Sequence, residues 1–391
     1  MLFTIFGAAV IALLPIAIGG YSIPSSCPNV PRPLYPYELA QGWAAVKVAD
    51  GLSSPRGIVV DESGRLLIVE EGMGISQHTI DINGCIVSSR KLVSMPILNH
   101  GIYFELNNRS LYASSASTVY RWEYDANTGN VSEPPTTIVS GMATDGHPTR
   151  TLIIPPNHPN LLVVSHGSNS NLDYAATDPT TARAIVKVFD ISNVPKVGYN
   201  YARDGWNAGY GLRNEVGLVF DGNNMLWGVE NSADQLVRDV NGTSVDIHND
   251  NPAEELNFLG DVSTPNNAWY GYPTCFTIWE TNATHGLDVG QQFVQSPNET
   301  FTDDTCAHMS MPPRLTFRAH SAPLDAKFDA PKYENLFATL HGSWDRYPPR
   351  DEGRCSSSSC ARPVGLVFDA MGRLYMTSDT SGEVFMLSGV I

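Results

Sequence analysis

The sequence predicts an all-β protein, a six-bladed β-propeller, from a hairpin pattern, its recurrence and the chain length. The clearest copy of the hairpin, residues 212–230, reads LRNEVGLVFDGNNMLWGVE. Two apolar runs flank a turn that begins at Asp221, which is typical of two antiparallel strands joined by a tight turn. Recurrence of such a hairpin along one chain indicates a radial array in which each copy begins a four-stranded blade.

Five further stretches repeat the pattern. They are RGIVVDESGRLLIVEE from Arg56, HGIYFELNNRSLYASS from His100, RTLIIPPNHPNLLVVSHG from Arg150, SAPLDAKFDAPKYENLFATLHGSW from Ser321 and RPVGLVFDAMGRLYMTSD from Arg362. Dividing 391 residues by six copies leaves roughly 60 residues per blade, more than propeller repeats usually have. Several connections are therefore long, and functional residues are expected in them.

The N-terminus predicts export. Residues 1–20 are apolar and uncharged and end in Gly19-Gly20, which indicates a secretory signal peptide followed by one propeller domain over residues 21–391. The segment lacks the usual N-terminal Lys or Arg of a signal peptide, and the alternative is a membrane anchor. Sequons for N-glycosylation occur at Asn108, Asn130, Asn241, Asn282 and Asn298. They favour secretion, and their spread favours a monomer.

Six cysteines also favour an oxidising compartment. Their positions suggest three disulfides, Cys27–Cys85, Cys275–Cys306 and Cys355–Cys360, although six cysteines allow fifteen pairings. A zinc site is disfavoured, since the chain has no CxxC pair. The formal charge of -16 argues against nucleic acid or an anionic membrane as a partner.

The remaining segments are placed between the hairpins. Residues 21–50 form a strap that leads to the first copy. Residues 236–320 contain no clear hairpin and are interpreted as the outer strands of blade four and much of blade five. Residues 382–391 are expected to be the last strand.

Basic or imidazole side chains occur just before every hairpin. In a propeller the first strand of each blade lines the central channel, so these positions are expected to converge at one channel mouth. They are Arg56, His100, His147 with Arg150, Arg213, His320 and Arg362. One interpretation makes these arginines structural tethers paired with carboxylates such as Asp61, Asp221 and Asp369. The other is a cationic pocket for a compact polyanion.

Several motifs give the chain a resemblance to a known family. TDGHPTR, GLRNEVG, ENSAD with NPAEELN, AWYGYP, AHSAPL, HGSWDR and ARPVG are similar in order and spacing to those of the pyrroloquinoline quinone (PQQ)-dependent soluble glucose/sorbosone dehydrogenases. The secreted architecture resembles the fungal pyranose dehydrogenase branch. The resemblance implies a six-bladed propeller that binds PQQ, a tricarboxylic quinone, together with Ca²⁺. It also implies oxidation of a sugar, a pyranose or a 2-keto sugar.

The resemblance assigns catalytic roles to two residues. His147, in TDGHPTR, is expected to take the proton of the sugar hydroxyl while hydride passes to PQQ. Nearby arginines are expected to keep its imidazole neutral. Arg213, in GLRN, is expected near the quinone carbonyl, where it would stabilise negative charge.

Other residues are expected to bind the cofactors. Asn214 is predicted to hydrogen-bond PQQ, and Arg362 and Arg346 to pair with its carboxylates, although Arg346 could instead brace Asp345. Trp344 is expected to stack on the quinone or to form a wall of the sugar site, and the alternative is a core tryptophan between blades. Further predicted PQQ contacts are Asn99, His100 and His341. The main-chain carbonyls of Ser232 and Ala233 are the predicted Ca²⁺ ligands.

This Ca²⁺ turn departs from the family, in which Gly-Pro is common. Asp234, Glu254 and Glu255 are expected to lie around the ion or in a solvated loop. Electrons are expected to pass to an external acceptor, such as a haem protein, a quinone or a copper oxidase. No GxGxxG motif follows a strand, which disfavours a nicotinamide or flavin enzyme. Two alternatives remain, a Ca²⁺-dependent propeller lactonase or hydrolase and a non-catalytic glycan-binding propeller.

Overall fold

The computed structural model describes residues 23–107, 109–240, 242–281, 286–346 and 360–389. The predicted signal peptide, the sequons at Asn108, Asn241 and Asn282, and Cys355 lie outside these ranges. The chain divides into two compact units. Unit 1 comprises residues 1–137, 324–341 and 350–391, and unit 2 comprises residues 138–323 and 342–349. A single domain over residues 21–391 stays a prediction.

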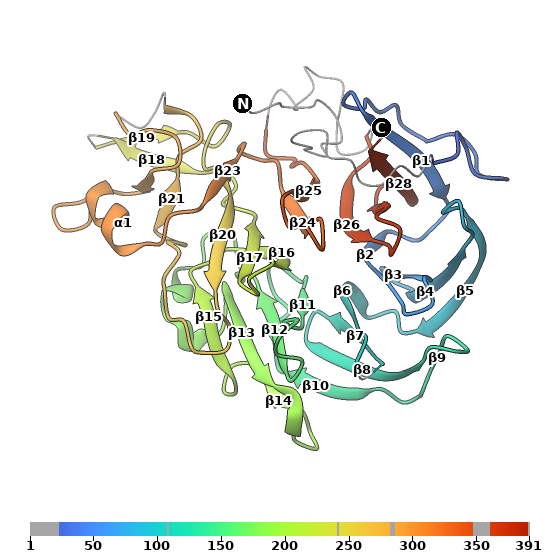
Figure 1. Cartoon of the computed structure of the whole chain (residues 1–391). Helices are drawn as coiled ribbons and strands as arrows, with labels where there is room; N and C mark the ends of the chain where they lie inside the picture. The colour runs from blue at the N-terminus through green and yellow to red at the C-terminus, as the bar shows by residue number, and fades with distance from the viewer. Residues whose placement is uncertain (1–22, 108, 241, 282–285, 347–359, 390–391) are drawn as a thin grey trace. The chain divides into compact units, whose positions relative to one another are not determined.

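Unit 1 contains three sheets of consecutive antiparallel strands (Figure 1). The first sheet has the order β2 (Pro55–Val60), β3 (Leu66–Glu70), β4 (Gly74–Ile80) and β5 (Ile86–Ser94). The second has the order β6 (Leu98–Glu105), β7 (Ser110–Ser115), β8 (Thr118–Asp125) and β10 (Thr136–Ser140), with β9 (Asn130–Val131) beside β8. The division between the units falls within β10.

The third sheet of unit 1 joins the two ends of the chain. Its order is β26 (Pro363–Phe368), β27 (Leu374–Ser378), β28 (Glu383–Gly389) and β1 (Trp43–Ala49). β1 pairs antiparallel with β28, so the predicted last strand is confirmed and an N-terminal strand completes its sheet. A two-stranded sheet of β24 (Pro323–Phe328) and β25 (Leu336–Leu340) also belongs here.

Unit 2 contains two four-stranded sheets. One has the order β11 (Leu152–Ile153), β12 (Leu161–His166), β13 (Ile185–Asp190) and β15 (Trp206–Tyr210). The other has the order β16 (Glu215–Phe220), β17 (Leu226–Glu230), β20 (Glu254–Gly260) and β23 (Leu315–Phe317). β14 (Tyr199–Asn200) pairs in parallel with the end of β10. Two small sheets consist of β18 (Val237–Val240) with β19 (Thr243–Asp246), and β21 (Cys275–Thr277) with β22 (Gln292–Val294).

All six predicted hairpins are confirmed, but six four-stranded blades are not. In the described ranges four sheets have the four-stranded order of a propeller blade, and a fifth, six-stranded sheet contains such an order in β6, β7, β8 and β10. The hairpin β24–β25 has no third strand there. The strand before it, β23, is the edge of the sheet of β20, and the described residues from 341 to 346 after it are not strands. Residues 236–320 therefore supply the outer strands of blade four, as predicted, and otherwise small sheets instead of blade five.

In unit 1, neighbouring sheets pack together through hydrophobic side chains on both faces of their strands. Along β3, Leu66 and Ile68 belong to one buried cluster with Tyr375 and Met386 of the third sheet. The alternate residues of β3 pack into a second cluster with residues of β6 and β7. Because side chains alternate between the faces of a strand, one strand contributes to two interfaces.

In several hairpins the aspartate that begins the turn also caps it. Asp61 Oδ1 accepts the main-chain N–H groups of Ser63 (2.9 Å) and Arg65 (2.8 Å), and Asp221 and Asp369 do the same in their hairpins. Such side-chain caps satisfy donors that a tight turn leaves open.

These aspartates do not pair with the arginines that precede the hairpins. The second oxygens of Asp61 and Asp369 accept from the arginines four residues later, Arg65 (2.9 Å) and Arg373 (2.6 Å). Asp221 accepts from the Trp227 indole at 3.0 Å. This part of the tether interpretation is therefore wrong, because the arginine that each of Asp61 and Asp369 pairs with belongs to its own hairpin and Asp221 pairs with none among the described residues.

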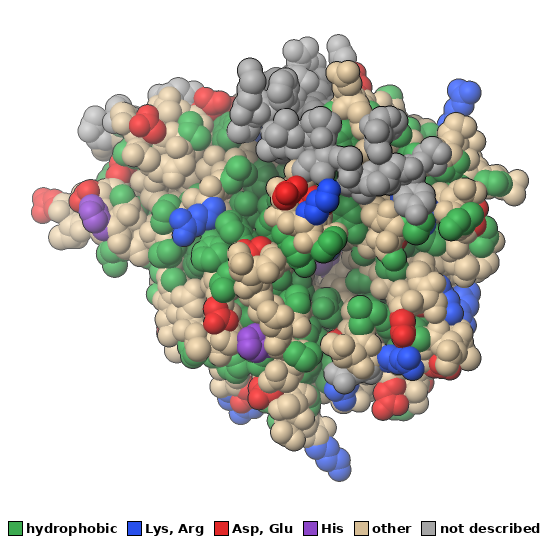
Figure 2. Space-filling model, in the orientation of Figure 1, with side chains coloured by type: hydrophobic (Ala, Val, Ile, Leu, Met, Phe, Trp, Pro, Cys, Tyr) green, Lys and Arg blue, Asp and Glu red, His purple; other side chains and the backbone are tan. Residues whose placement is uncertain are grey.

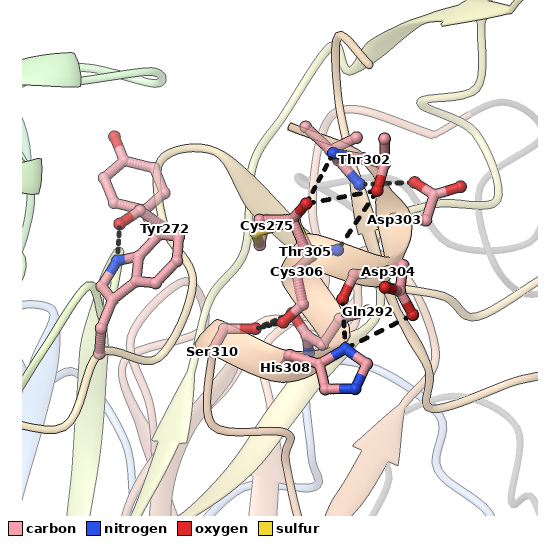
Figure 3. Close-up of a disulfide and its surroundings, with 12 residues drawn as sticks. Tyr272, Cys275, Gln292, Thr302, Asp303, Asp304, Thr305, Cys306, His308 and Ser310 are labelled. Carbon is pink, nitrogen blue, oxygen red and sulfur yellow. Dashed lines mark hydrogen bonds and ion pairs between the residues drawn. A yellow bond between two sulfur atoms is a disulfide. The ribbon is translucent and has the colours of Figure 1, made fainter. Parts of the chain in front are cut away.

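Two predicted disulfides are confirmed, Cys27–Cys85 in unit 1 and Cys275–Cys306 in unit 2. Cys360 is also disulfide-bonded. The second disulfide attaches helix α1 (Asp303–Met309) to β21 (Figure 3). Thr302 caps the helix in a capping box with Thr305, which satisfies its first free N–H groups.

The surface fits an acidic protein. On the face shown in Figure 2, charged side chains are scattered among hydrophobic and uncharged ones. Both described sequon asparagines, Asn130 and Asn298, are exposed. Across the described ranges, no helix is long and apolar enough to cross a membrane.

We expect Asp61→Ala to lower the free energy of unfolding by about 3 kcal/mol, because a buried carboxylate that pairs with arginine is removed. The aspartate also accepts a hydrogen bond of 2.5 Å from the Tyr124 hydroxyl. Chemical denaturation measures the change. The matched control is Asp125→Ala, whose exposed carboxylate caps its turn through the Asn127 N–H and should cost below about 1 kcal/mol. Equal losses in the two variants would contradict the assignment.

Candidate functional site

The loop before β11 places His147 against Ser168, which follows β12. The Ser168 carbonyl oxygen accepts hydrogen bonds from the main-chain N–H of His147 at 3.1 Å and from its Nδ1 at 3.0 Å. Because a carbonyl oxygen only accepts, the ring proton is on Nδ1 and Nε2 carries a lone pair. His147 is therefore arranged to accept a proton at Nε2.

The electrostatic surroundings keep His147 neutral, as the sequence predicts. Burial lowers the pKa of His147 to about 3, and the positive charges of Arg213 and Arg150 contribute to the lowering. Burial has the larger effect, whereas the sequence interpretation relied on the arginines alone. The imidazole is consequently uncharged at neutral pH.

Gly167 allows two predicted site residues to lie against it. A Cβ atom at this position would be 2.6 Å from Asn214 Oδ1 and 2.8 Å from His147 Cβ. Only glycine permits such a close approach. The turn at the end of β12 thus brings together the predicted proton acceptor and Asn214.

The main chain of Ser168 also connects His147 with Arg213. The Ser168 N–H donates to the Arg213 carbonyl at 2.8 Å, while the Ser168 carbonyl holds the imidazole. Ser168 is fully buried. Ser168 is not among the predicted site residues, and the only sequence signal for it is the polar segment SNSNLD, residues 168–173, that it begins.

Hydrogen bonds to neighbouring residues of unit 2 hold the guanidinium group of Arg213. Its Nε and Nη2 donate to Asn171 O (3.2 Å) and Oδ1 (2.9 Å), Nη2 also donates to Asp234 Oδ2 (3.0 Å), and Nη1 donates to Asn231 O (3.2 Å). Among the described residues these contacts use all but one of the five guanidinium N–H groups. Arg213 can therefore offer one N–H to a ligand from a rigid position, and Asn171 is a second positioning residue that the sequence analysis missed.

Buried glutamates fix the backbone beneath these side chains. Glu230, at the end of β17, accepts the main-chain N–H of Arg213 at 2.6 Å. Glu254, on β20, accepts the N–H groups of Ser232 at 2.6 Å and of Ala322 at 3.3 Å. The alternative of Glu254 in a solvated loop is wrong, because it is buried in the sheet. Its position near the ion stays a prediction, and its hydrogen bond to the Ser232 N–H is compatible with it.

Three neighbouring carboxyls form a buried network. Asn257 Nδ2 donates to Glu230 at 2.9 Å and to Glu215 at 3.3 Å, and Thr277 Oγ1 donates to Glu255 at 2.5 Å. Burial raises the pKa of Glu215 and Glu230 far above the usual value and that of Glu255 to about 7. The alternative of Glu255 in a solvated loop is wrong, because it lies in the central strand β20.

The network continues toward the Cys275–Cys306 disulfide. Gln292 Nε2 donates to Thr277 Oγ1, and Ser310 Oγ lies 3.3 Å from Gln292 Oε1 and donates to Cys306 O at 2.7 Å. Gln292, Cys306 and Ser310 appear together in Figure 3. Hydrogen bonds thus link the strand that carries Glu255 to the helix α1 segment.

The predicted metal-binding turn follows β17. Ala233 is buried, and no described residue donates a hydrogen bond to the carbonyl oxygen of Ser232 or Ala233. Main-chain carbonyls of this kind suit a hard cation such as Ca²⁺. The donor set of the turn fits the predicted metal.

Trp344 and Arg346 also lie in unit 2. Trp344 is 66% exposed, so the alternative of a core tryptophan is wrong and its ring is accessible for stacking. Arg346 pairs with Asp250 at 3.1 Å and also donates to Asn249 O. Within the described ranges its buried Nε has no hydrogen-bond partner. An acidic ligand is a suitable acceptor for it.

Unit 1 gathers the other predicted residues around Asp379. This carboxylate pairs with Arg56 at 2.6 Å and with His341 Nε2 at 3.0 Å, and Arg362 Nη2 lies 2.7 Å from His341 Nδ1. Burial opposes ionisation of Asp379, but the hydrogen bond and charge of His341 and the charge of Arg56 hold its pKa far below the usual range. Arg56 is thus a structural tether as well as a basic group.

Asn99 and His100 lie side by side in β6, where Asn99 is half-buried and His100 is buried. Burial, with the charge of Arg56, puts the pKa of His100 well below the usual value. In the described part of the chain, neither His100 Nδ1 nor Arg56 Nε has a hydrogen-bond partner. These two buried polar atoms fit a polar ligand. Binding by the individual predicted residues stays a prediction.

The chain is similar to known proteins along nearly its whole length. A family described as TrAA12-like matches residues 37–351 and 349–390. A "pyrroloquinoline quinone-dependent pyranose dehydrogenase" of Coprinopsis cinerea is 37% identical over 93% of this chain and 56% of its own length. A "pyrroloquinoline quinone-dependent sugar dehydrogenase" of Hypocrea jecorina is 34% identical over 96% of this chain and 95% of its own. The chain therefore spans a little over half the length of the first relative.

Two solved structures of proteins of this kind also match the chain. The holo form of the PQQ domain of the Coprinopsis cinerea pyranose dehydrogenase matches with a TM-score of 0.89 and 37% identity, over 93% of this chain and 99% of that chain. The calcium structure of a Trichoderma reesei carbohydrate-active enzyme of family AA12 matches with a TM-score of 0.85 and 34% identity, over 93% of this chain and 100% of that chain. The chain has the all-β propeller fold of these proteins.

We expect the free energy of unfolding of Glu255→Gln to increase, relative to that of the wild type, as pH rises from 4 to 8. The folded wild type keeps the Glu255 proton up to a pKa of about 7, whereas the unfolded chain loses it near pH 4.3. The contribution of Glu255 to the stability of the wild type therefore falls as pH rises between these two pKa values. The difference should grow by about 3 kcal/mol, since one pKa unit is worth about 1.4 kcal/mol.

Urea unfolding at each pH measures this difference. Glu299→Gln, at an exposed position, is the matched control and should show no pH trend. A flat difference for Glu255→Gln would mean that the carboxyl is ionised in the fold.

Proposed function

The chain belongs to the TrAA12-like family, and on this premise we propose that it is a quinoprotein that oxidises a sugar. The reaction removes a hydride from a hydroxyl-bearing carbon of a pyranose or 2-keto sugar and a proton from the hydroxyl. PQQ, when bound, supplies the quinone that accepts the hydride, and Ca²⁺ polarises it. Electrons then pass to an external acceptor.

The observation that carries this proposal is the arrangement of His147. The Ser168 carbonyl fixes the ring proton on Nδ1, so Nε2 can accept the hydroxyl proton of the sugar. Arg213 supports this role in two ways. Its charge adds to the effect of burial, which keeps the imidazole neutral before the reaction, and its remaining N–H can stabilise negative charge that develops during the transfer.

The cofactor assignments rest on the donors described above. The Ser232 and Ala233 carbonyls are proposed Ca²⁺ ligands. Asn214 and Arg346 in unit 2 are proposed PQQ contacts, and exposed Trp344 a stacking surface. The predicted PQQ contacts of unit 1 are Asn99, His100, His341 and Arg362. A ligand with several carboxylates suits guanidinium donors that the protein itself already orients.

We also propose that the protein is secreted. Disulfides persist in oxidising compartments, two pairings are described, and exposed sequons are compatible with glycosylation. The signal peptide at residues 1–20 and the monomeric state are part of the same proposal.

We expect His147→Gln to lower kcat for sugar oxidation by about 10²- to 10⁴-fold, the usual contribution of general base catalysis. PQQ affinity should change little. Dye reduction with a panel of aldoses measures turnover, and calorimetric titration of PQQ into metal-stripped protein, with and without Ca²⁺, measures binding. His158→Gln is the control histidine, since His158 lies in the β11–β12 turn and is not a predicted site residue.

Wild-type turnover in His147→Gln with normal binding would remove His147 from the mechanism. Absence of PQQ binding by the wild-type protein, with and without Ca²⁺, would sink the oxidoreductase proposal. The lactonase and glycan-binding alternatives would then be the ones to test.

A further inference from the structure

Three side chains of unit 2 converge without a hydrogen-bond donor between them. They are Asp234, His320 and Asp345, whose ligand atoms all lie within 4.8 Å of one another. Sequence analysis placed His320 only among the basic groups that precede the hairpins, and gave neither aspartate a direct metal-binding role. The three residues come from distant parts of the chain, so the tertiary structure alone brings them together.

The tautomer of His320 is set by its outer contact. The His320 side chain is 3% exposed, and its Nε2 contacts the main-chain carbonyl of His248. A carbonyl oxygen accepts only, so the ring proton is on Nε2. Nδ1 therefore presents a lone pair on the opposite side of the ring.

That lone pair faces the carboxylates. Nδ1 is 4.0 Å from Asp234 Oδ1, which is too far for an N–H···O hydrogen bond even if Nδ1 carried a proton. In the described residues no other group donates a hydrogen bond to Nδ1. The buried imidazole thus points a free acceptor atom into the cluster.

A hydrogen bond to Oδ2 orients the side chain of each aspartate. Asp234 Oδ2 accepts from Arg213 at 3.0 Å, and Asp345 Oδ2 accepts from the main-chain N–H of Gln235 at 2.5 Å. For Oδ1 of either aspartate, no hydrogen-bond donor is found among the described residues. Each carboxylate is held in place by one oxygen, and a carboxylate oxygen of each lies within 4.8 Å of the other ligand atoms of the cluster.

We propose that Asp234, His320 and Asp345 bind a divalent first-row transition metal ion. Three acceptors gathered in a largely buried place repel one another, and a cation between them removes the repulsion. An imidazole nitrogen with two carboxylates is a donor set for such metals, whereas Ca²⁺ prefers oxygen alone. Three protein ligands leave further coordination positions for water or another ligand.

This site is separate in its donors from the proposed Ca²⁺ site. The calcium turn offers main-chain carbonyls of Ser232 and Ala233, whereas the new site uses side chains, the first of which is the next residue. Binding of the metal needs no quinone and no sugar. The proposal therefore stands or falls independently of the oxidoreductase assignment.

Zn²⁺ is the probe for the test. Calorimetric titration of Zn²⁺ into the metal-stripped full chain, without PQQ, should give one site per chain. His320→Ala should weaken it by more than about 100-fold, since even residues that only support a ligand contribute 10- to 100-fold. Asp345→Asn keeps an acceptor for the Gln235 N–H and should weaken Zn²⁺ similarly if His320→Ala fails to fold.

The matched control is His308→Ala. His308 and Asp304 form another histidine–aspartate pair, at 3.4 Å on α1, but both are exposed and no third ligand is near among the described residues. This variant should bind Zn²⁺ like the wild type. Co²⁺ in the site should give visible absorption bands that disappear in Asp345→Asn.

Three results would overturn the proposal. The first is no stoichiometric Zn²⁺ binding by the wild-type chain. The second is Zn²⁺ affinity unchanged in a folded His320→Ala or Asp345→Asn variant. The third is displacement of Zn²⁺ by an equal concentration of Ca²⁺, which would identify an oxygen site.

Discussion

The hydrogen bond from the Arg213 main-chain N–H to the buried carboxyl of Glu230 is the constraint on which the site depends. It fixes the start of β16 against the end of β17, and the Arg213 carbonyl then holds Ser168. Ser168 in turn holds the imidazole of His147. One buried hydrogen bond beside the sheet of β16 and β17 thus sets the position of His147, in the loop before β11 of another sheet.

The site is polar because the sheet beneath it is polar. Glu215, Glu230 and Glu255 are buried where propeller strands usually carry apolar residues, and Asn257 and Thr277 satisfy part of their hydrogen-bonding capacity. Burial of carboxyls is unfavourable unless they are hydrogen-bonded or protonated. Their raised pKa values are the consequence, and Glu230 is the member of the network that holds the main chain of a functional loop, at Arg213.

Much of the fold could be predicted from local pattern. Paired apolar runs around a polar turn identified all six hairpins, because strand alternation and turn formation depend on residues close in sequence. The number of complete blades could not be predicted. Whether β23 pairs with β20 or with the next hairpin depends on competition between distant strands, and the sequence carries no signal for it.

The sequence by itself determined the residue types of the site and the motifs around His147 and Arg213, and it suggested two disulfides that the structure confirms. Only the tertiary structure decided what each group contacts. Arg213 is largely occupied by Asn171, Asn231 and Asp234, and His320 faces two aspartates instead of joining a cationic pocket. The physical reason is that hydrogen bonds and ion pairs act over a few ångströms in space, so partners distant in sequence are defined only after the sheets have formed.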